Sequence, residues 1–168
     1  ATSNLVPRWA HREEFHRLRS MGLTIHGQYT AASWAYIGSQ GIMQGTFEVF
    51  DACAKKYFNG SLKGRIVLTG GLGGMGAAQG PAIDMNEGVG LIVEINKERI
   101  QHRLKTGHIH KAFTDIRTAW KHCQEAAKNG QGRVYAVLGN ASDACSWFLK
   151  SHDKPDVVTD QTSAHNLL

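Results

Sequence analysis

Three glycines have the spacing that a dinucleotide phosphate group requires. Gly71, Gly73 and Gly76 form the pattern G-x-G-x-x-G directly after the apolar run RIVLTG, which is typical of a buried parallel strand. The first glycine permits a tight turn, the second lets a pyrophosphate approach the backbone, and the third lets the next helix pack closely on the strand. That helix then directs unpaired N–H groups at the phosphates. The motif is weak by itself, because glycine-rich turns are common.

An acidic residue stands where the dinucleotide interpretation requires one. Glu94 lies at the end of the second predicted strand, GLIVEI, at roughly the 20-residue separation from the glycine motif that the fingerprint specifies. A carboxylate there accepts hydrogen bonds from the ribose hydroxyls of NAD and repels the additional phosphate of NADP. The alternative is a solvated carboxylate at a strand end. Together, the two features favour NAD as the ligand.

Polar residues also follow the two later strands. Asn140 and Ala141 come after RVYAVLG, and Gln161 comes after PDVVTD. Ligands of open parallel sheets bind beyond the carboxyl ends of the strands, so these loops should surround the same crevice as the glycine turn. Asn140 has a second interpretation as the N-cap of the following helix, and the two roles are compatible.

The elements that must position these residues alternate along the chain. Apolar runs predict strands within residues 65–70, 90–95, 133–140 and 155–160. Helical patterns occupy residues 13–21, 46–58 (capped by Thr46), the stretch after the glycine motif with a break near Pro81, 112–127 (closed by Asn129-Gly130) and 141–152. The order predicts an α/β fold: a doubly wound parallel sheet, that is, a Rossmann-like NAD-binding domain over residues 61–168. We expect residues 1–60 to form an irregular, partly helical N-terminal segment that packs on this domain and belongs partly to an adjoining core domain.

Composition argues against several other classes of protein. The 168 residues are 42% apolar and 20% charged, with a formal net charge of +5, which suits one globular domain. Basic residues in KERIQHRLKTGHIHK are interleaved with apolar and acidic ones, so we expect a solvated helix face and no nucleic-acid partner. No apolar run is long enough to span a bilayer, and the first residues lack the apolar core of a secretory signal, so we expect no membrane partner.

Cysteine and histidine do not form a metal-site pattern. Cys53, Cys123 and Cys145 are odd in number and widely spaced, which favours reduced thiols in a cytoplasmic protein. His108 and His110 lie two residues apart, but no carboxylate or cysteine completes a zinc set. We therefore expect no metal site.

Longer stretches resemble one known family. GQYTAASWAYIGSQGIMQGTFEVF, GSLKGRIVLTGGLGGMGAAQ, GNAS and VVTDQTSAH are similar, in this order, to the urocanate hydratase (urocanase) family, and NLVPRWA near the start is similar too. YIGSQGIMQGT and DQTSAH are much more specific than the glycine motif. The resemblance covers nearly the whole chain. It implies the NAD-binding domain of a lyase that adds water to urocanate to give imidazolonepropionate in histidine degradation, with NAD⁺ as an electrophilic prosthetic group.

The resemblance also implies which residues contact NAD. Besides the motif glycines Gly71 and Gly73, the matching positions are Gln28, Gly74, Met75, Gly76, Glu94, Arg99, Asn140, Ala141, Gln161, Thr162, Ser163, Ala164 and His165. The guanidinium of Arg99 can pair with the phosphates or brace Glu94. The sequence departs from the family at Ala32 and Ala77, where the family tends to have glycine, at Gly80, where it tends to have proline, and at Asn166, where aspartate is expected.

The family's catalytic cysteine segment is absent from this sequence. None of the three cysteines lies in such a motif, so we expect no catalytic residue in this chain and no turnover of urocanate by it alone. The complete enzyme is expected to be a cytoplasmic homodimer. Two alternatives stay open: a non-catalytic NAD-binding module from a truncated paralogue, and an NAD-dependent dehydrogenase domain. A dehydrogenase would need a substrate-side acid or base that the sequence does not supply.

Overall fold

The computed structural model describes residues 11–23 and 38–162 of the chain. The chain divides into two compact units, Ala1–Gly41 and Ile42–Leu168. In the first unit, helix α1 (Arg12–Ser20) lies within one residue of the span expected for it, and the side chain of His11 caps it by accepting a hydrogen bond from the Glu14 N–H. The sequence-based division after residue 60 stays a prediction.

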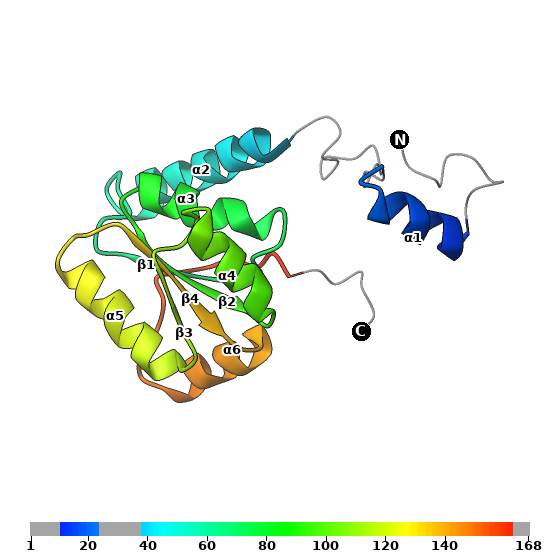
Figure 1. Cartoon of the computed structure of the whole chain (residues 1–168). Helices are drawn as coiled ribbons and strands as arrows, with labels where there is room; N and C mark the ends of the chain where they lie inside the picture. The colour runs from blue at the N-terminus through cyan, green and yellow to red at the C-terminus, as the bar shows by residue number, and fades with distance from the viewer. Residues whose placement is uncertain (1–10, 24–37, 163–168) are drawn as a thin grey trace. The chain divides into compact units, whose positions relative to one another are not determined.

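The second unit is built on a parallel sheet (Figure 1). Its five strands are β1 (Ile66–Gly70), β2 (Val89–Glu94), β3 (Lys111–Phe113), β4 (Arg133–Leu138) and β5 (Val157–Val158), in the spatial order β3-β4-β2-β1-β5. Every neighbouring pair is parallel, and Glu94 at the end of β2 pairs with Leu138 at the end of β4. The carboxyl ends of the strands therefore lie along one edge. The expected doubly wound α/β fold is confirmed.

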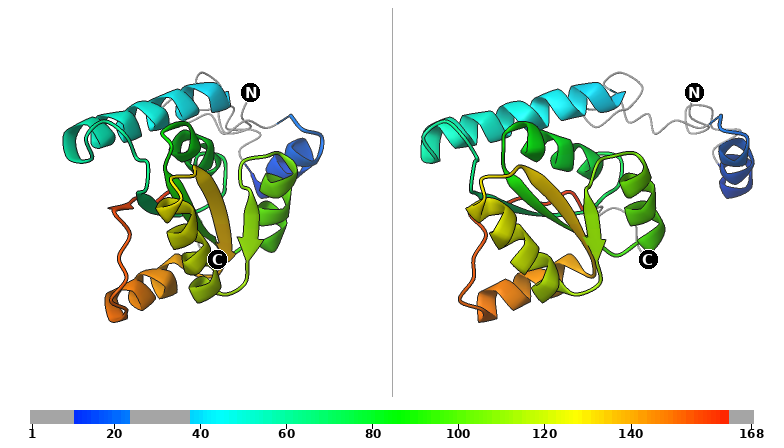
Figure 2. Two further views of the ribbon diagram at one scale, coloured as in Figure 1. Left: turned by 90° about the vertical axis from the view of Figure 1, so that its left-hand side faces the viewer. Right: turned by 60° about the vertical axis from the view of Figure 1, so that its left-hand side comes forward.

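Helices cover both faces of this sheet (Figures 1 and 2). One face carries α2 (Gly38–Tyr57), α3 (Gln79–Met85) and α4 (Lys97–Lys105). Phe50 of α2 packs in a cluster with Val67 of β1 and Ile83 of α3. The other face carries α5 (Ile116–Lys128) and α6 (Ala141–Lys150), whose Trp120 and Phe148 rings meet edge to face at 4.8 Å. Strand β2 shows how the faces alternate, because successive side chains point to opposite faces. Leu91 and Val93 lie in the cluster with Trp120, whereas Ile92 lies in a third cluster with Ile100 of α4.

The helix expected over residues 112–127 begins later than the sequence indicated. Lys111–Phe113 is the edge strand β3, and Asp115 caps α5 by accepting the Thr118 N–H. Pairing with β4 decides the difference, because Ala112 lies opposite Ala136 in the register. A three-residue strand cannot be distinguished from the first turn of a helix by periodicity alone.

Helix α2 begins eight residues before the position expected for it, at Gly38 instead of Thr46. Thr46 is therefore not a cap but an interior residue, whose hydroxyl donates to the Ile42 carbonyl at 2.7 Å. Glycine weakens a helix without forbidding it, so the stretch GSQGIMQG is helical despite its composition. Within the described parts of the chain, no helix is long and apolar enough to cross a membrane.

The segment after the glycine motif has no break at Pro81. A short 3₁₀ turn (Gly76–Ala78) leads directly into α3, and Pro81 lies in the first turn of that helix. Proline is tolerated there, because the first-turn N–H groups have no partner within the helix. The helical start is thus placed at Gly76, the last glycine of the motif.

Candidate functional site

The segment of residues 71–76, which joins β1 to the 3₁₀ helix and includes the first residue of that helix, is called the glycine turn below. Gly71 has a φ of +90°, a conformation that favours glycine, and a Cβ there would lie 2.7 Å from the Gln161 carbonyl oxygen. A Cβ on Gly76 would overlap the carbonyl oxygen of Gly71, whereas one on Gly73 would meet nothing within 4 Å. Gly71 therefore has the geometry of a tight turn, Gly76 that of a close backbone contact, and Gly73 faces open space.

Four consecutive backbone N–H groups in this turn are available to a ligand. Gly71 donates to the Val93 carbonyl, and Leu72 donates to the Glu94 carboxylate. No acceptor among residues 11–23 and 38–162 takes the N–H groups of Gly73, Gly74, Met75 and Gly76. Successive unpaired N–H groups form a concave site for anions. The glycine turn can therefore bind an anionic group such as a phosphate.

The buried side chain of Glu94 supports the glycine turn through hydrogen bonds. Only 3% of this residue is exposed. One carboxylate oxygen accepts the Leu72 N–H at 2.6 Å, and the other accepts the Asn96 N–H at 2.9 Å. The arrangement uses two of the carboxylate's roughly four acceptor positions. The ribose contact expected from the sequence stays a prediction, and bracing the turn is the role that the geometry shows.

Two arginines of α4 stand beside the turn. Arg99 places a guanidinium nitrogen 3.8 Å from Glu94, so it makes the bracing contact that was one of its two expected roles. Arg103 donates to the carbonyl oxygens of Leu72 and Gly73. Two effects lower the pKa of Arg103: the larger is burial of its guanidinium, and the smaller is repulsion from the positive charge of Arg99. A negatively charged ligand nearby would relieve that repulsion.

The turn and α4 line an open hollow of about 460 Å³. It is lined by Leu72, Gly73, Gly74, Asn96, Glu98, Arg99, His102 and Arg103. Its walls thus combine backbone of the glycine turn with the charged face of α4. Both features suit an anion.

Loops after β4 and β5 close the other side of the turn. The Gln161 N–H donates to the Gly70 carbonyl at 2.9 Å. Asp160 accepts the N–H and the hydroxyl of Thr162 and so shapes the segment that carries Gln161. A Cβ on Gly70 would lie 2.7 Å from Asp160 and 3.3 Å from the Ala141 side chain. Three strand ends therefore meet at one point, as the sequence indicated.

Asn140 acts as the helix cap that the sequence allowed. Its side-chain oxygen accepts the Ser142 N–H at 2.9 Å at the start of α6. We expect Asn140→Ala to lower the free energy of unfolding by about 1 kcal/mol, because α6 loses this bond. Asn140→Ser keeps an acceptor oxygen and should stay within about 0.5 kcal/mol of the unmodified chain. Urea unfolding measures both, and an unchanged midpoint for the alanine variant would contradict the capping role.

The structure brings most of the expected site residues together, and four lie outside its description. Residues on the glycine turn or on the strand ends and helix starts around it are Gly71, Gly73, Gly74, Met75, Gly76, Glu94, Arg99, Asn140, Ala141, Gln161 and Thr162. Gln28, Ser163, Ala164 and His165 fall outside the described residues. Sequence reasoning missed Arg103 and Asp160. The four-residue spacing from Arg99, which places Arg103 on the same helix face, was the available signal.

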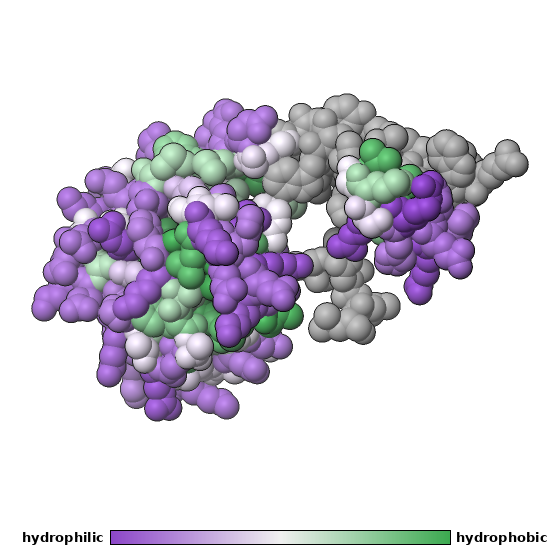
Figure 3. Space-filling view, in the orientation of Figure 1, coloured by the Kyte–Doolittle hydropathy of each residue, from purple (hydrophilic) through white to green (hydrophobic). Residues whose placement is uncertain are grey.

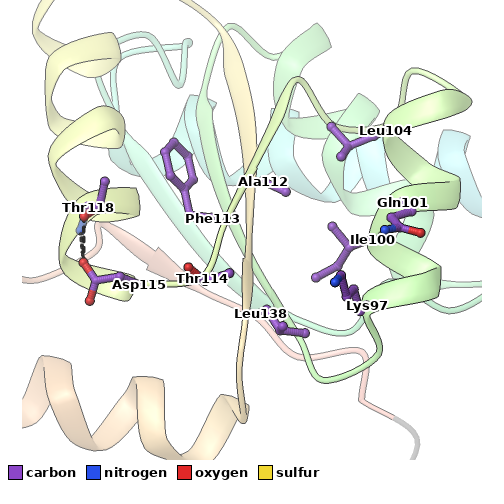
Figure 4. Close-up of a pocket in the computed structure, with 10 residues that line it drawn as sticks. All are labelled: Lys97, Ile100, Gln101, Leu104, Ala112, Phe113, Thr114, Asp115, Thr118 and Leu138. Carbon is purple, nitrogen blue, oxygen red and sulfur yellow. Dashed lines mark hydrogen bonds between the residues drawn. The ribbon is translucent and has the colours of Figure 1, made fainter.

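A second hollow, of about 440 Å³, lies on the other side of α4. Figure 4 shows its lining from α4, β3 and the start of α5, and the space-filling view has an apolar strip between α4 and α5 (Figure 3). Two polar groups of its lining are engaged with each other, because Asp115 accepts from both the N–H and the hydroxyl of Thr118. The Phe113 ring packs against His122 at 4.8 Å. The glycine turn, with its open donors, is the stronger candidate site.

The cysteines show no arrangement for catalysis or metal binding. All three are free, with Cys123 buried, Cys53 half-buried and Cys145 exposed. Burial raises the pKa of the Cys123 thiol to about 12, so this thiol stays protonated and unreactive. Within the described residues, no three His, Cys, Asp or Glu side chains are grouped so that they could hold a metal ion.

Two protein-family models match the chain. The one described as "Urocanase Rossmann-like domain" matches residues 38–168, and the one described as "Urocanase N-terminal domain" matches residues 1–35. The first match includes the whole sheet, the glycine turn and both arginines of α4. The second precedes the sheet.

Proposed function

We propose that this chain, which belongs to the urocanase family, holds NAD for a lyase that hydrates urocanate. The family implies hydro-lyase activity of the full-length protein. Within that protein, this chain would supply the nucleotide-binding domain. Urocanate itself would contact other residues of the full-length protein, including the family's catalytic cysteine segment.

The observation that supports NAD most directly is the row of four N–H groups, from Gly73 to Gly76, for which residues 11–23 and 38–162 offer no acceptor. A pyrophosphate offers several charged oxygens at the spacing of adjacent peptide groups, and hydrogen bonds to a charged acceptor are about twice as strong as neutral ones. The small residues at Gly71 and Gly76 keep the turn compact around them. The site therefore suits the centre of a dinucleotide.

The remaining contacts with NAD would come from α4 and from the strand ends. Arg99 lines the hollow beside the glycine turn and would pair with the phosphates there, and Glu94 keeps acceptor capacity for ribose hydroxyls. The loops at Asn140–Ala141 and Gln161–Thr162 would orient the ligand and exclude water from the far side of the turn. When bound, NAD supplies an electron-accepting nicotinamide ring. The part played by this chain is to hold and orient that ring.

Binding of NAD by the purified chain tests the proposal. The protein is first denatured, and released small molecules are identified by mass spectrometry. Chain freed of ligand is then titrated calorimetrically with NAD, with ADP and with nicotinamide riboside, which lacks phosphates. We expect NAD to be released or to bind, ADP to bind more weakly, and the riboside not to bind. Absence of NAD from both experiments rejects the proposal, and equal affinity for the riboside rejects the phosphate cradle.

A further inference from the structure

We infer that Arg103 is a positioning residue, which fixes the direction in which the N–H groups of the glycine turn point. The inference rests on the proposed function of the turn as a phosphate site. Arg103 lies on α4, outside the glycine motif and outside the residues that sequence reasoning assigned to the ligand. Its role follows from two hydrogen bonds and from the geometry of the peptide bond.

Arg103 holds two consecutive carbonyl groups. Its Nε donates to the Leu72 oxygen at 3.3 Å, and its Nη2 donates to the Gly73 oxygen at 3.1 Å. The Ala77 N–H donates to the same Gly73 oxygen at 3.1 Å. Both peptide planes are thereby fixed on their carbonyl side, one of them by two donors.

Fixing a carbonyl fixes the next N–H group. In a trans peptide, the C=O of one residue and the N–H of the following residue lie in one plane and point in opposite directions. The structure has no cis peptide bond in this turn. With the carbonyls of Leu72 and Gly73 directed at Arg103, the N–H groups of Gly73 and Gly74 must point away from it. These are the first two of the four open donors.

Glu94 anchors the same turn through the preceding peptide, since its carboxylate accepts the Leu72 N–H at 2.6 Å. An acceptor and a donor from outside the turn therefore hold successive peptide planes. The restraint matters because glycine has few conformational limits of its own. Without it, Gly73 and Gly74 would sample many orientations, and binding would have to order them.

The chemistry of the side chain makes the inference specific to arginine. A guanidinium is planar and carries donors at a fixed separation, which lets one group reach two neighbouring oxygens. A lysine ammonium has a similar charge but is a single point on a flexible stem. A purely electrostatic role for residue 103 would tolerate lysine, whereas a positioning role would not.

Three variants of the chain test the inference. Arg103→Ala and Arg103→Lys are compared with Arg133→Ala, an exposed arginine at the start of β4 and at the opposite edge of the sheet. We expect both Arg103 variants to bind NAD about ten-fold more weakly, the equivalent of one lost charged hydrogen bond, and Arg133→Ala to bind normally. Millimolar methylguanidinium should restore binding to Arg103→Ala but not to the lysine variant. Full affinity of Arg103→Lys, or absence of rescue with a folded Arg103→Ala, would overturn the inference.

A measurement on the ligand-free chain separates this inference from the proposed function. The amide signals of Gly73 and Gly74 in nitrogen-15 NMR spectra report the order of the two peptide planes directly. We expect both signals to shift and broaden in Arg103→Ala and to stay unchanged in Arg133→Ala. If the unmodified chain binds no NAD while this contrast holds, the proposed function fails and the positioning role stands. If NAD binds but the two signals are unaffected by Arg103→Ala, the positioning role fails alone.

Discussion

Replacement of Gly76 by alanine is expected to weaken NAD binding by about 100-fold or more, which corresponds to about 2.7 kcal/mol. The added Cβ would overlap the carbonyl oxygen of Gly71, and two backbone segments cannot avoid each other by a change of side-chain rotamer. The turn has to open or the 3₁₀ start has to shift. Either movement redirects the four N–H groups on which the phosphate site depends. Calorimetric titration with NAD measures the loss.

A matched variant shows whether the effect belongs to the site. Gly45 lies inside α2, where a Cβ would meet nothing within 4 Å. Gly45→Ala should leave NAD binding intact and raise the free energy of unfolding by up to about 1 kcal/mol, because alanine favours helix. Gly76→Ala should keep the far-UV circular dichroism of the sheet and helices. Retention of NAD by a folded Gly76→Ala chain would contradict the placement of the phosphates.

Removal of the Glu94 carboxylate should affect both stability and binding. Glu94→Ala leaves the N–H groups of Leu72 and Asn96 without their acceptors. Two unsatisfied donors at or near a buried position should lower the free energy of unfolding by about 3 kcal/mol, a fall in the melting temperature of about 10 °C. The glycine turn loses its support, so NAD binding should weaken as well. Thermal unfolding measures the change in stability, and calorimetric titration with NAD measures the change in binding.

Glu94→Gln distinguishes the charge from the shape of the side chain. Both carboxylate oxygens accept N–H groups, so one amide nitrogen of glutamine would face a donor. We expect stability between that of the alanine variant and that of the unmodified chain, and a smaller preference for NAD over NADP in both variants. An unchanged melting temperature for Glu94→Ala would contradict the bracing role. Equal affinity of the unmodified chain for NAD and NADP would contradict the expected preference.

The sequence by itself determined the parts of the site that depend on local chemistry. Glycines at positions 71, 73 and 76 indicated a tight turn, and the turn has the required φ at Gly71 and the close contact at Gly76. Buried strands were recognisable from uninterrupted apolar runs, because parallel strands between two helix layers are apolar on both sides. The cap at Asn140 followed from residue type alone. For the turn and the cap, local signals sufficed because residues close together along the chain make the interaction.

Elements without a strong local signal were decided by tertiary structure. Residues 111–113 form a strand only because β4 offers them a pairing edge, and a segment that short satisfies helical and extended patterns equally well. The start of α2 was misplaced because the low helix propensity of glycine is a modest penalty that other terms outweigh.

The roles of Glu94 and Arg103 could only be assigned in three dimensions. Sequence position placed Glu94 at a strand end, but it did not show the direction of the carboxylate. In the structure the carboxylate points toward the glycine turn and accepts the Leu72 N–H. Arg103 is separated from its partner carbonyls by about thirty residues, and hydrogen bonds over such separations depend on how α4 packs against the turn. Sequence therefore indicated most of the described residues around the site, but not Arg103 or Asp160. The packing of α4 on the sheet decided how Glu94 and Arg103 hold the N–H groups of the glycine turn in place.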